Sequence, residues 1–186
     1  MSNDLVVFAL REEAPILFAK YKNIHCIGVG KVNSAINTMK LIDKYQPKRV
    51  INLGTAGAIN LEPNIYRVNR LIQHDVNLLA VGLAPGYHLH DTLNEIRLYG
   101  PGKTCASGDM FVTESHKLRV HCDMIEMEAY SVAKACVLND IEVEVWKYIS
   151  DKADENAGVT FQEQVAAGED LYMKVLRELN VNLEEK

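Results

Sequence analysis

The stretch DMIEMEA (residues 123–129) ends an apolar run with carboxylates, and YISDKAD (residues 148–154) does the same later in the chain. Each stretch is typical of a buried strand that ends where it meets solvent. A carboxylate is expensive to bury alone, so acids at these positions are poorly placed for packing and well placed for chemistry. Two such strand ends in one small chain predict carboxylates that converge around a ligand.

The remaining pattern favours an α/β fold. Helical spacing covers residues 32–45, 128–138 and 161–179, and the segment 11–15 is expected to open a further helix. Short apolar runs typical of buried strands lie at 5–10, 23–28, 49–53, 67–72, 78–81, 104–107, 124–127 and 143–150. Strands that alternate with helices predict a central mixed, twisted sheet flanked by helices. Without repeats or a linker, residues 1–186 are expected to form a single domain.

Composition narrows the function classes. The chain has 186 residues, 48% of them hydrophobic, which is enough for a substantial core. Its net charge of −5 argues against non-specific nucleic-acid binding, because that binding needs Lys and Arg to neutralise phosphates. The N-terminal residues do not resemble a signal peptide, and no apolar stretch is long enough to span a bilayer. Four cysteines without Cys-x-x-Cys spacing indicate reduced thiols, so we expect a cytoplasmic protein without a membrane partner.

The turn GVGKVN (residues 28–33) invites comparison with two nucleotide-binding motifs. A P-loop needs glycine five residues before the Gly-Lys pair, where this chain has His25, and Val32 follows the lysine. A dinucleotide fingerprint needs a small residue at Asn33. The turn fits neither motif. The later segment GTAG (residues 54–57) is expected to form a loop that can offer backbone N–H groups to a ligand.

The histidines raise the question of a metal site. His88 and His90 alternate along the chain, so on a strand they would share one face and could chelate zinc, with His74 and Asp75 as further donors. No third ligand has persuasive spacing. We therefore expect exposed loop histidines and no metal.

Taken together, the turn at 28–33, the segment 54–57, the stretch ASGDMFV (residues 106–112) and the two acidic strand ends resemble the purine nucleosidase and phosphorylase family. The closest likeness is to its hydrolytic branch, the methylthioadenosine/S-adenosylhomocysteine nucleosidases, and it spans roughly residues 5–179. The resemblance implies a nucleoside phosphorylase-like sheet, a small-molecule nucleoside substrate, no cofactor and a homodimer.

The resemblance also assigns roles to the acids. Asp151, preceded by Ser150, matches the residue that protonates or hydrogen-bonds purine N7 as the base leaves. Glu13 matches the glutamate that orients and activates water, with Glu12 as an alternative. Glu128 occupies the position that accepts hydrogen bonds from ribose hydroxyls. Outside a family context, Glu128 and Asp151 would be interpreted as acids that cap a helix or favour its first turn.

Five further positions are implied to bind substrate. Thr55 would lie near the ribose and the attacking water, and Met127 against the ribose face. Phe111 would stack on the purine, and backbone groups at Val112 would read the purine edge. Phe161 would cover the 5′ substituent. A lone Met or Phe would otherwise be assigned to the core.

The implied reaction is hydrolysis of the N-glycosidic bond of 5′-methylthioadenosine or S-adenosylhomocysteine, with release of adenine. Three alternatives stay open: a phosphorolytic nucleoside phosphorylase, a futalosine hydrolase and a non-catalytic nucleoside-binding relative. A phosphorylase needs a cationic pocket, for which Arg11, Arg49 and Arg67 are candidates. Lys147 stands where nucleosidases often have arginine, and it lacks the planar fork of arginine.

Overall fold

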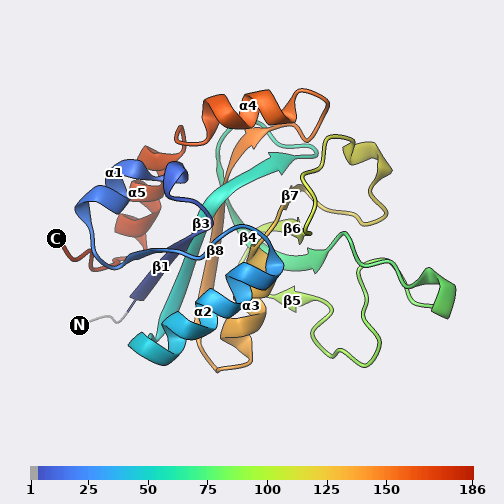
Figure 1. Ribbon diagram of the computed structural model, residues 1–186, viewed down its shortest axis with the longest axis horizontal. Coiled ribbons are helices and arrows are strands. Elements are labelled where there is room, and N and C mark those ends of the chain that lie inside the picture. The colour runs from blue at the N-terminus through green and yellow to red at the C-terminus, as the bar shows by residue number, and fades with distance from the viewer. Residues whose placement is uncertain (1–3) are drawn as a thin grey trace.

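A mixed sheet with helices on both sides forms the centre of the computed structural model, which describes residues 4–186 (Figure 1). The strands are β1 (Asp4–Phe8), β2 (Ile24–Cys26), β3 (Arg49–Ala58), β4 (Ile65–Gln73), β5 (Ile96–Arg97), β6 (Lys103–Ser107), β7 (Met124–Glu126) and β8 (Glu142–Asp151). The helices are α1 (Pro15–Lys20), α2 (Lys31–Tyr45), α3 (Ala129–Val137), α4 (Ala157–Gln164) and α5 (Glu169–Glu178), with short 3₁₀ helices at Arg11–Glu13, Leu79–Val81 and Ser115–Lys117. The predicted α/β class with a flanked mixed sheet is confirmed.

The sheet closes on itself at one end. Its order is β2-β1-β3-β7-β6-β4-β5, and β8 pairs with both β3 and β4. The strands β3, β7, β6, β4 and β8 therefore form a ring of neighbours. Gly57 on β3 lies beside Asp151 on β8 and beside Ile125 on β7. This pairing brings together the two acidic strand ends.

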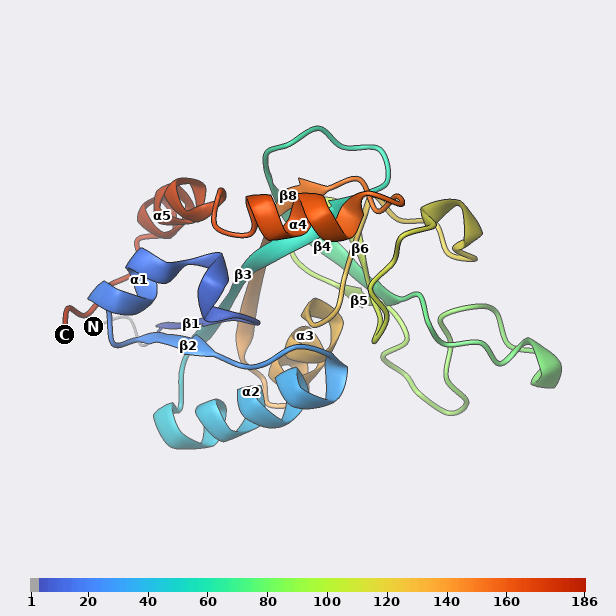
Figure 2. The ribbon, with the colours of Figure 1, turned by 45° about the horizontal axis from the view of Figure 1, so that its top comes forward.

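Two apolar clusters lie on opposite sides of β1 and β3. Val6 and Phe8 pack in the cluster that includes α1 and α5, whereas Leu5 and Val7 pack in the cluster that includes α2 and α3. Figure 2 shows α2 and α3 below the sheet and α4 across its upper edge. Because the central strands are buried on both faces, their sequences are continuous apolar runs and do not alternate with polar residues.

Two of the predicted elements are wrong. The segment 78–81 is not a strand: it contains the 3₁₀ helix Leu79–Val81, with Leu79 and Val81 exposed in the long connection between β4 and β5. The segment 54–57 is not a loop, because β3 continues through it and pairs with β8 as far as Gly57. Glycine in a strand here permits close approach of other elements, which a local pattern does not reveal.

The predicted helix over 161–179 is interrupted. The chain turns at residues 165–168 between α4 and α5. At Gly168 an added Cβ would lie 2.7 Å from Cγ of Tyr148, so the turn presses the backbone onto β8. The break follows from this contact with the sheet, and α5 then covers the cluster around Phe8.

Candidate active site

A cavity of about 180 Å³ opens at the joined ends of β3, β7 and β8. Every residue that the sequence indicated as catalytic or substrate-binding lines it, namely Glu13, Thr55, Phe111, Val112, Met127, Glu128, Ser150, Asp151 and Phe161. Residues that the sequence did not indicate complete the wall, among them Leu10, Val29, Met110 and Glu126. One cavity therefore collects side chains that lie far apart along the chain.

Glu13 is held at the cavity by donors to both of its oxygens. It ends the 3₁₀ turn after β1 and is 3% exposed. Oε2 accepts the Leu10 N–H (3.0 Å), and Oε1 accepts both the N–H (2.7 Å) and the hydroxyl (2.9 Å) of Thr55. The pKa of Glu13 is raised, chiefly by burial, although the Lys147 ammonium and these hydrogen bonds act in the opposite direction. Glu12 is exposed and does not line the cavity, so the geometry selects Glu13 of the two.

The Asp151 carboxylate is fixed by its own strand end. The Ser150 hydroxyl donates to Oδ2 (2.8 Å), and the Ala153 N–H donates to Oδ1 (2.9 Å). Ala153 has φ of 49°, a left-handed conformation that turns the chain back toward the carboxylate. Gly57 provides the space, since an added Cβ there would lie 2.7 Å from Oδ1 of Asp151. The carboxylate is 7% exposed and keeps one orientation toward the cavity.

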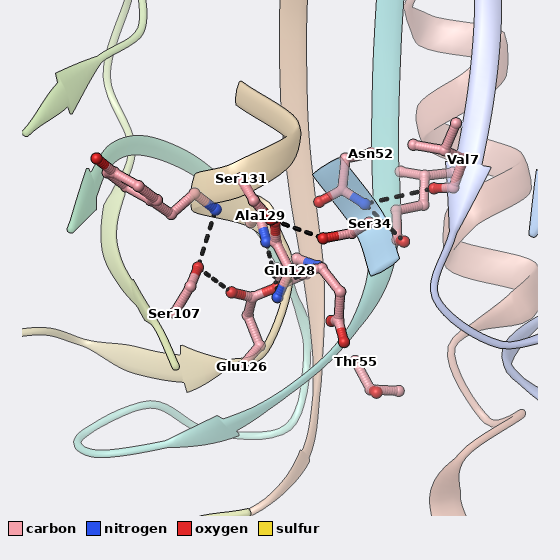
Figure 3. Close-up of polar contacts among 12 residues, drawn as sticks. Val7, Ser34, Asn52, Thr55, Ser107, Glu126, Glu128, Ala129 and Ser131 are labelled. Atoms are coloured by element: carbon pink, nitrogen blue, oxygen red, sulfur yellow. Dashed lines mark hydrogen bonds and ion pairs between the residues drawn. The ribbon is translucent and has the colours of Figure 1, made fainter. Parts of the chain in front are cut away.

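Glu126 is the acidic residue of the cavity wall that the sequence did not indicate. Its Oε2 accepts the N–H groups of Glu128 (3.0 Å) and Ala129 (2.8 Å), and its Oε1 accepts the Ser107 hydroxyl (Figure 3). These bonds satisfy unpaired N–H groups at the start of α3. The capping role considered for Glu128 therefore belongs to Glu126. The signal was present, because Glu126 is an acid at the end of an apolar strand just before a helix.

Because Glu126 accepts the N–H groups at the start of α3, the Glu128 side chain is available to contact the turn at Gly30. Its Oε1 accepts the Gly30 N–H (2.9 Å). Burial, together with the negative charge of Glu126, raises the pKa of Glu128 to about 8. Protonation of Glu128 is therefore favoured up to a higher pH than protonation of an exposed glutamate.

Lys147 is the buried cation of the site. It is 1% exposed, and its Nζ lies 2.9 Å from Oε2 of Glu126. Burial alone would lower the pKa of Lys147, but Glu126 and Glu128 raise it above its usual value. The pKa of Glu126 is lowered because this ammonium and the surrounding donors outweigh burial. Lys147 forms its ion pair with Glu126, whereas burial dominates at Glu13 and Glu128 and raises their pKa values.

Two aromatic rings form part of the apolar wall. Phe111 comes from the connection between β6 and β7, and Phe161 from α4. Their ring centroids are 5.9 Å apart, and the ring planes are inclined at 70°. Phe111 is 49% exposed, so it lies at the mouth of the cavity. Aromatic side chains can contact a planar heteroaromatic group through stacked or edge-to-face packing.

The histidines do not form a cluster. His88 and His90 are exposed, whereas His74 is buried with neither ring nitrogen hydrogen-bonded. Within residues 4–186, no three His, Cys, Asp or Glu side chains are grouped so that they could hold a metal ion. No helix in the same range has the length and apolarity needed to cross a membrane.

Comparison with known proteins identifies the family. The sequence profile of the Phosphorylase superfamily matches residues 16–179. A 5′-methylthioadenosine/S-adenosylhomocysteine nucleosidase of Buchnera aphidicola subsp. Baizongia pistaciae is 31% identical, over 84% of this chain and 81% of the relative. The chain therefore belongs to the Phosphorylase superfamily.

Solved structures share the fold. A mutant of the Helicobacter pylori nucleosidase MTAN, solved with 5′-methylthioadenosine in its active site, superposes with a TM-score of 0.87 and 22% identity, over 96% of this chain and 97% of that one. The native futalosine hydrolase of H. pylori superposes with a TM-score of 0.85 and 22% identity, over 94% and 95% of the two chains. The nucleoside phosphorylase-like architecture expected from the sequence is confirmed.

Proposed function

We propose that this protein hydrolyses the N-glycosidic bond of a 5′-substituted adenosine, 5′-methylthioadenosine or S-adenosylhomocysteine, and releases adenine. The curated relatives carry this nucleosidase name. The observation that carries the proposal is the charge of the cavity wall. It contains four carboxylates, and no Lys, Arg or His is among the described residues that line it.

This wall favours water over phosphate as the second substrate. At the surface of the cavity a phosphate dianion would meet acidic side chains and no basic one, and the buried Lys147 is already paired with Glu126 (2.9 Å). The candidate arginines are engaged elsewhere: Arg49 pairs with Asp4 (2.9 Å) and Arg67 with Glu144 (2.7 Å), and Arg11 lies over the ring of Phe18 (5.1 Å). Within residues 4–186, none of these arginines lines the cavity, which supports hydrolysis over phosphorolysis.

Asp151 and Glu13 supply the two proton transfers in this proposal. A departing purine accumulates negative charge, and Asp151 would deliver or share a proton at N7 as general acid. Water must then attack the anomeric carbon of the oxocarbenium-like sugar, and Glu13 would orient and deprotonate this water. The hydrogen bonds to Glu13 from Leu10 and Thr55 aim the carboxylate, and its raised pKa brings it closer to that of a useful base.

Glu128 would bind the ribose. A protonated carboxyl can donate one hydrogen bond and accept others, which suits adjacent sugar hydroxyls. Ser150 would act at the purine indirectly, because its hydroxyl donates a hydrogen bond to Asp151. Met127 and Phe161 would contact the sugar and the 5′ substituent through their apolar surfaces.

The test is a panel of purine nucleosides assayed for free base with and without added phosphate. We expect adenine from 5′-methylthioadenosine or S-adenosylhomocysteine in both conditions. Strict dependence on phosphate, with ribose 1-phosphate as product, would establish a phosphorylase. Preferential turnover of futalosine would establish the other hydrolase, and tight binding without base release would indicate a binding protein.

The proposed assembly is a homodimer formed through α2 and α3. These helices border a groove whose apolar side chains are exposed, with Val32 at 66%, Ile36 at 50% and Leu138 at 66%. The groove extends to Asp109, which immediately precedes Met110 in the cavity wall. A second copy on this face would cover apolar surface and lie beside the cavity.

A further inference from the structure

Three charged residues close a ring of hydrogen bonds beside the cavity. Lys31 Nζ donates to Oδ1 of Asp75 (2.6 Å), and the Asp109 N–H donates to Oδ2 of the same carboxylate (2.8 Å). The Lys31 N–H donates to Oδ1 of Asp109 (2.6 Å) and completes the ring. The side chains of Lys31 and Asp75 are only 17% and 16% exposed. The ring joins the start of α2, the end of β4 and the connection after β6.

The neighbours of these residues in the chain belong to the cavity. Gly30, which precedes Lys31, donates its N–H to Glu128. Met110 and Phe111, which follow Asp109, form the cavity wall. Gly30 has φ of 89°, and an added Cβ there would lie 2.9 Å from Oδ1 of Asp109. The turn that contacts Glu128 and the segment that carries the aromatic wall are therefore pressed together at the ring.

The connection between β6 and β7 is held at two places, one before and one after the wall residues Met110 and Phe111. On the β6 side, the ring of His74 packs against Gly108, where an added Cβ would clash with the imidazole, and the His74 N–H donates to the Ser107 carbonyl (3.0 Å). Farther along, the Ser115 N–H donates to the Ala153 carbonyl (3.2 Å). The Asp109 hydrogen bonds thus hold the start of the segment 110–114, which carries the wall between the two anchors.

We propose that Asp75, Lys31 and Asp109 are positioning residues for the proposed hydrolysis. Their ring of hydrogen bonds fixes the position of the wall residues Met110 and Phe111 relative to Glu128. An exposed ion pair contributes little by itself. Here the charges act on backbone N–H groups of two segments, and such charge-assisted hydrogen bonds are short and directional. The inference rests on the proposed function for the identity of the reaction.

The main variant is Asp75→Asn, which keeps the side-chain volume and removes the charge. We expect KM for the nucleoside to rise about tenfold with a much smaller change in kcat, because the wall binds the base in the ground state and the transition state alike. Lys31→Met should raise KM similarly, and the double variant should cost no more than either single change, since all three disrupt one ring. Lys31→Arg retains the charge and should keep KM near the wild-type value.

The matched control is Glu95→Gln, which removes a carboxylate paired with Arg70 and Arg97 (2.6 Å each), and none of these three residues lines the cavity. It should leave KM unchanged. A readout independent of turnover is amide hydrogen exchange, which should accelerate together at residues 28–31 and 108–112 in Asp75→Asn and in neither segment of the control. If Asp75→Asn does not fold, Asp109→Asn replaces it, because Asp109 is exposed.

Wild-type KM together with unchanged exchange in a folded variant would overturn the inference. If the wild-type protein releases no base from any nucleoside, the proposed function fails. The equilibrium Kd for adenine then replaces KM in the same comparison. A Kd that is equal in wild type and Asp75→Asn would then overturn the positioning role as well.

Discussion

Asp151 and Glu13 share one feature at the residue scale. Each carboxylate accepts hydrogen bonds on both oxygens from the protein and still faces a cavity. Such donors fix the direction of a side chain before any ligand arrives, so less free energy is spent on ordering it during the reaction. An isosteric substitution at either position should therefore remove the proton transfer while leaving the packing of the side chain unchanged.

Asp151→Asn should lower kcat by about 10²–10⁴ with little change in substrate binding, because an amide cannot deliver a proton to purine N7. Single-turnover rates beside equilibrium binding would measure the two effects. Glu155→Gln, an exposed change nearby, is the control and should leave both quantities unchanged. Near-wild-type turnover by Asp151→Asn would assign the leaving-group role to another acid.

Glu128 should make the free energy of unfolding depend on pH. Its folded-state pKa of about 8 lies above the ordinary glutamate pKa of 4.5, so between these limits the folded protein binds more protons than the unfolded chain. The stability from this group is complete below about pH 4.5 and is lost as pH rises through about 8. Urea unfolding from about pH 5 to 9 should therefore show a smaller decline in Glu128→Gln than in wild type. The control Glu163→Gln, on an exposed side chain, should keep the wild-type decline, and an equal decline in both variants would contradict this account.

At the element scale, β3 depends on glycine where other elements approach it. Oδ1 of Asp151 would lie 2.7 Å from a Cβ at Gly57, and Cβ of Ala153 would lie 3.1 Å away. The strand can therefore continue beside Asp151 and Ala153 because Gly57 carries no side chain. The same absence of bulk leaves room for the carboxylate.

Gly57→Ala should reduce kcat on the order of 10²-fold, because the Asp151 carboxylate must shift away from the new methyl group. The matched control is Gly158→Ala on α4, where nothing lies within 4 Å of the added Cβ. That control should keep full activity and gain about 0.5–1 kcal/mol in unfolding free energy from helix propensity. Full activity of Gly57→Ala at wild-type stability would show that the carboxylate tolerates displacement.

On the scale of the whole molecule, α2 and α3 lie together on one side of the sheet (Figures 1 and 2). The cavity lies where the ends of β3, β7 and β8 meet, and a separate groove runs along α2 and α3. The loop after β6 contributes Asp109 to the groove and Phe111 to the cavity. Coverage of the groove by a second copy would therefore bear on the loop that carries the aromatic wall.

Light scattering should show a dimer, and Ile36→Glu should weaken it, because a charge would replace an apolar side chain that lines the groove. Ile16→Glu on α1, where the side chain is also exposed (67%, against 50% for Ile36), should leave the dimer intact. A fully active monomer at assay concentration would exclude the dimer as a requirement for activity.

Local sequence was sufficient for much of the fold. Seven of the eight predicted strands occur, because a strand buried on both faces produces an apolar run that a short window detects. The acids that end these runs could also be recognised, and Asp151 and Glu128 do meet at one cavity. The likeness of short motifs to a known family indicated further wall residues such as Thr55, Phe111 and Phe161, but it did not indicate Leu10, Val29 or Met110.

Only the tertiary structure decided which charges meet. Glu126 on β7 pairs with Lys147 on β8, two strands that each pair with β3, and Asp75 after β4 pairs with Lys31 of α2. These pairings depend on strand register and on where a loop returns, and neither is encoded within a short stretch of sequence. The interruption before α5 has the same origin, because Gly168 turns against Tyr148 of a distant strand. Hydrophobic periodicity is a local property, whereas the desolvation and pairing of a buried charge are determined by the complete fold.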